Sequence, residues 1–304
     1  MLILTHEACL QHDTGPGHPE HAGRLDAVLE SIERASLSGT ETRQSRAASR
    51  DELGRVHPVR YVDRILATIP ASGRVFIDGD TVVSSASGEA GLHAAGSVAE
   101  AVETALSGSH RRVFCAVRPP GHHAESSRAM GFCLFNSIAV GAAALLDRDP
   151  SARVAIIDFD VHHGNGTQEI FETNRRVFYA STHQSPLYPG TGHAHERGAG
   201  TIRNHPLSPG AGSREFREAW ARLVDEIEAF EPHLVMISAG FDAHRLDPLA
   251  DLNVTTDDYA WLTEALLGVA ERQAEGRIIS ALEGGYSLTA LKESVRAHLE
   301  VLND

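Results

Sequence analysis

The chain has 304 residues, of which 42% are hydrophobic, so it can bury one large core or two small ones. Its 27 Lys and Arg residues against 41 Asp and Glu residues give a net charge of −14, which argues against a general nucleic-acid binder and is compatible with basic peptides or cationic small molecules. Three widely spaced cysteines, Cys9, Cys115 and Cys133, favour neither a disulfide framework nor a cysteine zinc site, and they indicate a reducing compartment such as the cytoplasm.

Short apolar runs alternate with longer amphipathic stretches along the chain. Residues 1–10 are too short and too polar for a signal peptide or a membrane span, and they predict a first strand. The predicted strands are Leu2–Leu4, Val113–Val117, Val154–Phe159, Val177–Ala180, Leu234–Ser238 and Ile278–Leu282. The predicted helices are Ala90–Leu106, Ser213–Phe230 and Thr256–Ala274, the last capped by Thr255 or Thr256. This alternation predicts one α/β domain over residues 1–304, with a central, mainly parallel sheet flanked by helices.

The stretch from Gln184 to Gly212 contains six glycines and four prolines, and it predicts a long loop without regular structure. Loops of this length inside a domain are usually functional. We expect this one to shape either a pocket or a subunit contact in a homo-oligomer.

Polar clusters follow the predicted strands. The segment RPPGHHAE follows Val113–Val117, DVHHGNG follows Val154–Phe159, GFDAHRLDPL follows the strand that starts at Leu234, and EGGY follows Ile278–Leu282. Side chains at the carboxyl ends of parallel strands converge on one crevice of an open α/β sheet. The four segments are therefore predicted to form a single site.

Asp160 and His162 are two residues apart, so an extended chain points both side chains to the same side. A third metal ligand would come from the loop of another strand, where Asp242 and Asp247 both qualify. A catalytic zinc ion accepts carboxylate and imidazole ligands and keeps one position open for water. The pattern predicts such a metal site.

A two-metal site is the alternative, because metal-dependent ureohydrolases also bind through Asp-x-His segments on an α/β sheet. Their pattern continues as Asp-x-His-x-Asp. Here Gly164 stands two residues after His162, and His244 stands two residues after Asp242. Without the additional carboxylates that bridge a second ion, one catalytic ion is favoured.

His122 and His123 follow two prolines and a glycine, which hold their backbone in a fixed turn. A buried Asp158 accepting from one imidazole would fix its tautomer and raise its basicity, and Asn165 would hold the other histidine without adding a charge. Tyr286 follows two glycines that let the backbone approach a ligand. Its phenol is a candidate donor to a developing oxyanion.

Seven motifs together resemble the zinc-dependent histone deacetylase family, which also includes acetylpolyamine amidohydrolases and bacterial histone deacetylase-like amidohydrolases. They occur in family order over nearly the whole chain: GHPEHAGRL (17–25), RPPGHHA (118–124), GFCLFNSIA (131–139), DFDVHHGNGTQ (158–168), YPGTG (188–192), SAGFDAHRLDPL (238–249) and LEGGY (282–286). The LEGGY form and Asn165 in place of aspartate are similar to class II members. The resemblance implies the arginase/deacetylase-like fold.

The resemblance implies that Asp160, His162 and Asp247 bind one zinc ion, which selects Asp247 over Asp242 as the third ligand. It also implies a monovalent cation such as K⁺, held mostly through backbone oxygens at Asp158, Asp160, His162 and Ser181.

By the same resemblance, His123 is the general base that takes a proton from the water on the zinc ion. His122, paired with Asp158, helps to protonate the leaving amine, and Tyr286 polarises the acetyl carbonyl together with zinc. Asn165 leaves His123 without a formal counter-charge. Because the chain retains Tyr286, the resemblance implies real activity.

The resemblance further implies an apolar substrate tunnel with Phe132 and Tyr188 as walls, Gly131 lining the channel and Gly285 contacting the substrate. Tyr188 replaces the commoner phenylalanine and would add a hydrogen bond at the rim. Polyamine-preferring members carry an acidic residue at the rim, where the alignment places Val254 in this chain.

We therefore expect a zinc-dependent deacetylase that hydrolyses the acetamide of N-acetylated primary amines, with acetyl-lysine of proteins or peptides as substrate. Acetylated polyamines or other small molecules are the alternative substrates. A non-catalytic acetyl-lysine binding module is disfavoured by the intact ligands, histidine pair and tyrosine. No nucleic-acid or membrane partner is expected.

Overall fold

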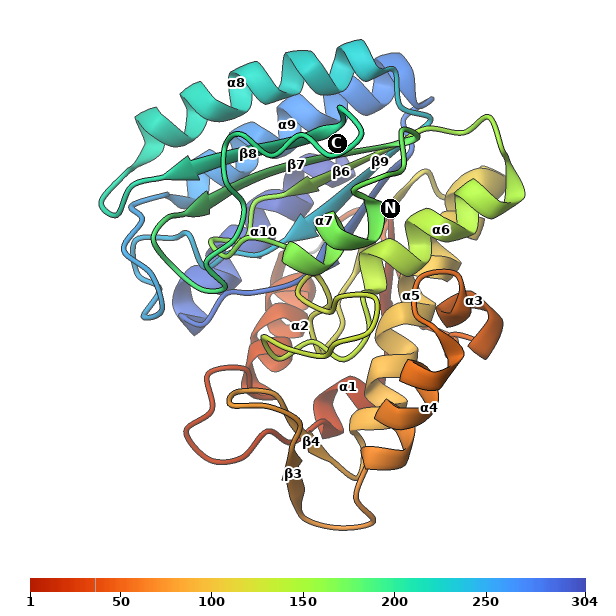
Figure 1. The fold of residues 1–304 in the computed structure, drawn as a ribbon. Helices are drawn as coiled ribbons and strands as arrows, with labels where there is room; N and C mark the ends of the chain where they lie inside the picture. Colours follow the sequence, from red (N-terminus) through yellow and green to blue (C-terminus); the bar gives the residue numbers. More distant parts are fainter. Residues whose placement is uncertain (36) are drawn as a thin grey trace.

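The computed structural model describes residues 1–35 and 37–304. An eight-stranded sheet forms its centre, and every pair of neighbouring strands in this sheet is parallel. In spatial order the strands are β2 (Glu41–Gln44), β1 (Leu2–Thr5), β5 (Arg112–Cys115), β10 (Ile278–Leu282), β9 (Leu234–Ala239), β6 (Val154–Asp158), β7 (Val177–Gln184) and β8 (Ile202–Leu207). The predicted α/β domain with a parallel sheet is confirmed (Figure 1).

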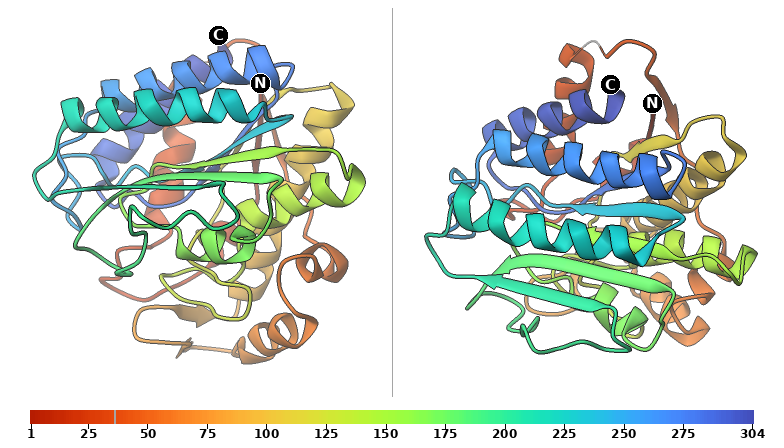
Figure 2. Two further views of the ribbon diagram at one scale, coloured as in Figure 1. Left: turned by 45° about the horizontal axis from the view of Figure 1, so that its top comes forward. Right: turned by 90° about the horizontal axis from the view of Figure 1, so that it is seen from above.

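Helices cover both faces of the sheet, as Figures 1 and 2 show. One layer consists of α2 (Gly23–Ala35), α10 (Leu288–Asn303), α9 (Thr256–Gln273) and α8 (Ser213–Phe230), each in contact with the next. The other face carries α5 (Ser87–Ser107), α6 (Ser137–Arg148) and α7 (Asn165–Phe171), with the short helices α1 (Glu7–Gln11), α3 (Arg50–Gly54) and α4 (Val59–Thr68). An antiparallel hairpin of β3 (Arg74–Phe76) and β4 (Val82–Ser84) lies at the bottom of Figure 1.

The predicted helices form where apolar spacing and caps coincide. Helix α8 buries Phe216, Trp220 and Leu223 on one face. Helix α9 begins with a capping box between Thr255 and Asp258, and α5 is longer than predicted at both ends. In the described part of the chain, no helix combines the length and the apolar composition that crossing a membrane requires.

The central strands β6, β9 and β10 are buried at every residue, as expected of strands that are covered on both faces. Their bounds differ from the predicted ones by no more than one residue. Strand β7 continues past the predicted end at Ala180 to Gln184, because its polar second half pairs with β8.

Both edge strands escaped prediction. Strand β8 lies inside the Gln184–Gly212 stretch that we expected to be a structureless loop, so that expectation is wrong there. Its Pro206 lacks a backbone donor, which an edge strand tolerates because β8 pairs only with β7. Strand β2 is exposed and polar throughout, a composition that protects a sheet edge and leaves no apolar signal.

Candidate active site

Four polar segments meet at the carboxyl-terminal ends of four inner strands of the sheet. Strands β5, β10, β9 and β6 are consecutive neighbours, and each predicted polar cluster follows one of them. These four strands pair in parallel, so their carboxyl-terminal ends lie on the same side of the sheet, and the arrowheads of β7, β8 and β9 in Figure 1 show this common direction. The predicted convergence of the four segments is therefore what the structure shows.

Two carboxylates and one imidazole form a buried group at these strand ends. Asp160, His162 and Asp242 each offer a ligand atom, and these atoms lie within 4.8 Å of one another. His162 Nδ1 is 3.0 Å from Asp160 Oδ1 and 3.1 Å from Asp242 Oδ2. Asp160 and His162 follow β6, whereas Asp242 follows the neighbouring strand β9.

Backbone groups fix the two carboxylates of this group. Val161 donates its N–H to Asp242 Oδ1 at 2.8 Å, and Gly284 donates to Asp160 Oδ2 at 2.8 Å. A side chain at Gly284 would overlap the Asp242 carboxylate, and one at Gly240 would overlap that of Asp160. The glycines that precede and follow these turns are therefore needed for the carboxylates to approach each other.

Asp247, which the resemblance selects as the third ligand, lies five residues after Asp242 in the same loop, and its role as a ligand stays a prediction. Besides burial and the charge of Asp160, the charge of Asp247 helps to raise the pKa of Asp242, so the two carboxylates lie near each other. Asp247 Oδ2 accepts the backbone N–H groups of Tyr286 at 2.7 Å and Ser287 at 3.1 Å, while Oδ1 accepts that of Leu249 at 3.1 Å. The carboxylate of Asp247 thus also holds the backbone just before α10.

The charges in this group attract a cation. Burial lowers the pKa of His162, but the Asp160 and Asp242 carboxylates outweigh burial and raise this pKa to about 10. Burial and the neighbouring charge of Asp160 raise the pKa of Asp242 to about 7. The two carboxylates repel each other and draw positive charge toward the imidazole. Two carboxylates and one imidazole are also a donor set that zinc accepts, so the residues fit a catalytic metal ion.

The two adjacent histidines have the partners that the sequence predicted. His122 Nδ1 lies 3.0 Å from Asp158 Oδ2, and His123 Nδ1 lies 2.8 Å from Asn165 Oδ1. Their ring centroids are 4.0 Å apart, and all four residues are buried. Each imidazole therefore presents its Nε2 edge to the site, with its other nitrogen occupied.

The surroundings shift the pKa values of the two imidazoles in opposite directions. Burial lowers the pKa of His122, but the charges of Asp158 and Asp160 raise it well above its usual value. Burial, followed by the charges of His122 and His162, lowers the pKa of His123 well below its usual value. At neutral pH one histidine is an acid and the other a base, which is the division of roles that proton transfer requires.

Tyr286 lies at the end of the EGGY segment, next to Phe132 and Arg24. Its ring centroid is 6.1 Å from that of Phe132 and 4.9 Å from the Arg24 guanidinium carbon. Burial raises the pKa of Tyr286 well above its usual value, so the phenol keeps its proton and can donate it in a hydrogen bond. Tyr286 also lines a groove of about 580 Å³, through which it is reached from outside.

The predicted substrate residues border the space next to His123. The Tyr188 ring centroid lies 5.2 Å from that of His123, and Tyr188 is 38% exposed. At Gly131, which has a φ of 56°, a Cβ atom would lie 2.5 Å from the His123 ring. Phe132 follows, also with a positive φ, and points its ring toward Tyr286.

Three further expectations concern Ser181, Gly285 and Val254. Ser181 lies opposite Asp158 in the pairing of β7 with β6, and the monovalent cation site at these residues stays a prediction. Gly285 has a φ of 123°, and its carbonyl accepts a hydrogen bond from Arg24 at 2.6 Å. Val254 is fully buried, so the expectation that it stands at the rim is wrong.

Sequence reasoning missed several buried residues that hold the site. Tyr179 donates to Asp158 Oδ2 at 3.1 Å, yet it sits in an apolar strand that gives no sign of this role. Glu283 belongs to the LEGGY motif, and a carboxylate directly after a buried strand is itself an indication of a functional or structural role. Arg118 and Glu20 form a buried ion pair, and both occur in motifs whose charges had no assigned partner.

Comparisons with known proteins agree over nearly the whole chain. The histone deacetylase domain family matches residues 18–302. A probable deacetylase of Archaeoglobus fulgidus is 37% identical over 298 residues, covering 94% of this chain and 81% of that protein. A histone deacetylase-like amidohydrolase of Pseudomonas aeruginosa is 36% identical, covering 92% of this chain and 80% of that protein. The crystal structure of the HDA15 HD domain superposes with a TM-score of 0.92 at 38% identity, covering 99% of this chain and 88% of that chain.

Proposed function

From the premise that this chain belongs to the histone deacetylase domain family, we propose that it hydrolyses the acetamide of N-acetylated primary amines, with the acetyl-lysine of proteins or peptides as substrate. The observation that carries the proposal is the pair of adjacent imidazoles, one held by the Asp158 carboxylate and the other by the Asn165 amide, beside a buried Asp-His-Asp group. An acid and a base next to a metal-binding group are the parts that amide hydrolysis by water needs.

The proposed cofactor is one Zn²⁺ ion held by Asp160, His162 and, as the resemblance implies, Asp247, with Asp242 as the alternative third ligand. When bound, it would supply a Lewis acid for the acetyl carbonyl and lower the pKa of the attacking water. The donor set supports this ion, because it offers two carboxylate oxygens and one imidazole nitrogen. We further propose that a monovalent cation such as K⁺ lies at Asp158, Asp160, His162 and Ser181.

The side chains of this chain divide the proton transfers. His123 is neutral and held by Asn165, so it accepts the proton of the attacking water. His122 is charged and held by Asp158, so it gives a proton to the leaving amine. Tyr286 keeps its phenol proton and donates a hydrogen bond to the carbonyl oxygen as that oxygen gains charge.

The walls of the site suit the aliphatic side chain of acetyl-lysine, because the Phe132 and Tyr188 rings border the approach to His123 and Tyr286. Acetylated polyamines are the second candidate substrates. They are favoured by the carboxylates of Asp80 and Asp78, which lie close enough to Tyr188 to add to the effect of burial in raising its pKa. Together with the net charge of −14, these carboxylates suit a cationic substrate.

A direct test compares hydrolysis rates of an acetyl-lysine peptide and of acetylspermidine by the zinc-loaded protein. We expect turnover that stops on chelation, returns with Zn²⁺ and is blocked by a hydroxamate. Binding of the peptide without release of acetate would instead indicate an acetyl-lysine binding module and contradict the proposal. The buried free cysteines fit a reducing compartment, and we propose the cytoplasm as the location.

A further inference from the structure

A second buried carboxylate, besides Asp158, contacts the histidine turn. Glu283 is 1% exposed and lies in the segment that leads from β10 to Tyr286. Its Oε2 accepts the backbone N–H of Gly121 at 2.7 Å and that of His122 at 3.2 Å. One carboxylate oxygen therefore joins the turn that carries Tyr286 to the turn that carries the two histidines.

This contact completes the support of His122. Asp158 holds the imidazole at Nδ1, whereas Glu283 holds the peptide N–H of the same residue. The turn has little room to move, because a Cβ atom at Gly121 would lie 2.6 Å from the backbone nitrogen of Ser137. With both ends of His122 fixed, its ring keeps its place next to His123.

The Glu283 segment is itself anchored. Arg24, which is fully buried, donates from Nε to the carbonyl of Gly285 at 2.6 Å and from Nη2 to the carbonyl of Glu283. The same guanidinium donates to Glu20 at 2.9 Å. Arg24 thus fixes the backbone on which the Glu283 side chain stands, so the carboxylate can set the position of the histidine turn.

A buried carboxylate in this place is costly. Among the residues that the structure describes, no Lys or Arg side chain pairs with the Glu283 carboxylate, and its partners are the two peptide N–H groups. Burial raises the pKa of Glu283 to about 7, although the His122 charge and the Gly121 N–H lower it. An apolar side chain would avoid this cost, which indicates that the acceptor has a use at this site.

We propose that Glu283 is a positioning residue, whose carboxylate fixes the Gly121–His122 backbone and thereby keeps both imidazoles aligned for proton transfer. Its effect on rate rests on the proposed deacetylase function. Displacing a catalytic group by about 1 Å costs up to roughly 100-fold in rate, so the acceptor oxygen must be in place.

Two substitutions separate geometry from charge. Glu283→Gln keeps an oxygen at the same reach and removes the charge. Glu283→Asp keeps the charge but withdraws the oxygens by about 1.5 Å, the length of one C–C bond. Both are compared with the zinc-loaded parent by kcat and KM for the acetyl substrate, by zinc content, and by hydrogen exchange of the Gly121 and His122 amides followed by NMR.

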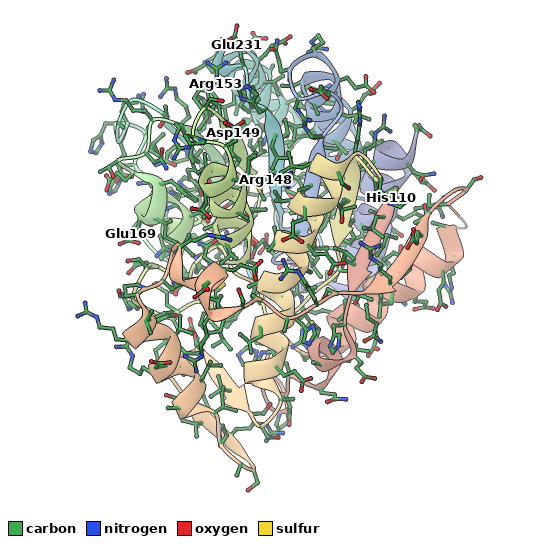
Figure 3. The ribbon with its side chains drawn as sticks, turned by 90° about the vertical axis from the view of Figure 1, so that its right-hand side faces the viewer. His110, Arg148, Asp149, Arg153, Glu169 and Glu231 are labelled. Carbon is green, nitrogen blue, oxygen red and sulfur yellow. The ribbon has the colours of Figure 1, made fainter. Side chains whose placement is uncertain are left out.

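We expect Glu283→Gln to keep both amides protected and kcat within about threefold of the parent. We expect Glu283→Asp to lose that protection and to lower kcat by roughly 10–100-fold, with KM and zinc content little changed. Glu169→Ala is the matched control, because Glu169, an exposed residue labelled in Figure 3, accepts the N–H of Ser126, four residues after His122, at 2.9 Å. This control should leave kcat and both amides as they are.

Several outcomes overturn the proposal. Glu283→Asp with full kcat, or with both amides still protected, shows that the carboxylate does not position the turn. A 100-fold slower Glu283→Gln with protected amides shows that the charge matters and not the position, and this reading holds even if Glu283→Asp fails to fold. A parent that hydrolyses neither substrate contradicts the proposed function, and the amide exchange still decides separately whether Glu283 holds the turn.

Discussion

At the scale of single residues, environment decides chemistry. His122 and His123 are adjacent and identical in covalent structure, but one faces the carboxylate of Asp158 and the other the neutral amide of Asn165. Each charge near a buried imidazole shifts its pKa strongly, because little solvent screens the interaction. An aspartate in place of Asn165 would add a counter-charge and raise the pKa of His123.

The two aspartates of the loop after β9 should behave differently when removed. Asp247→Ala removes the third ligand that the resemblance implies, so we expect the purified protein to lose most of its zinc. Asp242→Ala keeps Asp247 and removes the acceptor of the Val161 N–H group and one partner of His162. We expect it to retain more zinc than Asp247→Ala and to lose activity, because His162 is held less firmly. Elemental analysis and kcat distinguish the two variants.

Zinc loss in Asp242→Ala with full zinc in Asp247→Ala would make Asp242 the third ligand instead of Asp247. Arg245→Ala is a suitable control, because Arg245 is an exposed residue of the same loop. It should change neither zinc content nor kcat.

The phenol of Tyr286 has a separate prediction. Tyr286→Phe keeps the ring against Phe132 and Arg24 and removes only the hydroxyl. Because that hydroxyl donates to the oxygen that gains charge, we expect kcat to fall by about 10²–10³ with zinc retained. A variant as fast as the parent would remove Tyr286 from the mechanism.

Local sequence patterns predict most of the site's contacts but not the choice of the third ligand. The Asp160–His162 spacing and the histidine pair predict their groups, because alternation along an extended chain and a proline-held turn are local properties. Asp242 and Asp247 share one loop, and local spacing does not say which of the two carboxylates is a ligand.

At the scale of elements, one buried ion cluster joins the segments around the site. The Glu20 carboxylate accepts from Arg118 Nη2 at 2.7 Å and from Arg24 Nη1 at 2.9 Å, and all three side chains are fully buried. Arg118 precedes the histidine turn, whereas Arg24 lies at the start of α2 and holds the backbone around Gly285. Glu20 thus couples three segments that are distant in sequence.

Glu20→Gln should therefore destabilise the protein strongly. It leaves two buried guanidinium groups without their counter-charge, and breaking such a pair costs about 3–5 kcal/mol. Burial raises the pKa of Glu20, but Arg118, His12 and Arg24 outweigh it and lower this pKa well below the usual value. Glu20 then stabilises the fold fully above its unfolded pKa of about 4.3, and this contribution is lost as the pH falls through the folded pKa.

Urea unfolding of parent and variant at several pH values measures this contribution. The difference in unfolding free energy should be largest at neutral pH and shrink in acid. Glu300→Gln is the control, because Glu300 forms an exposed pair with Arg296 at 2.7 Å and should cost less than about 1 kcal/mol. An equal cost for the two variants would contradict a structural role for the buried cluster.

The elements that the sequence revealed and those it concealed differ in burial. Strands such as Val154–Asp158 are covered on both faces, so their composition is almost wholly apolar and easily recognised. The edge strands Glu41–Gln44 and Ile202–Leu207 are polar or interrupted by proline, because an edge must resist further pairing. These edge strands form because they pair with a neighbouring strand, and the composition of the segment itself does not indicate that pairing.

At the scale of the whole molecule, neutral histidines buried in the core make stability depend on pH. Burial lowers the pKa of His298 to about 3, and its ring nitrogens are paired with the hydroxyls of Thr263 at 2.6 Å and Ser280 at 2.9 Å. Burial also lowers the pKa of His57 to about 4. Below a pH of about 6.5 the unfolded chain protonates these imidazoles, whereas the folded protein does not.

This difference predicts the sign of the pH dependence. The unfolded state binds more protons, so each such histidine makes the unfolding free energy fall by about 1.4 kcal/mol per pH unit as the pH drops below 6.5 toward the folded pKa. His298→Gln removes one of these sites and should flatten the slope between pH 6.5 and 5 by about that amount. His193→Gln, at an exposed position, should leave the slope unchanged. If urea unfolding of the zinc-loaded proteins gives the same slope for His298→Gln and the parent, the imidazole of His298 is not a neutral core group, and the acid sensitivity must come from elsewhere in the fold.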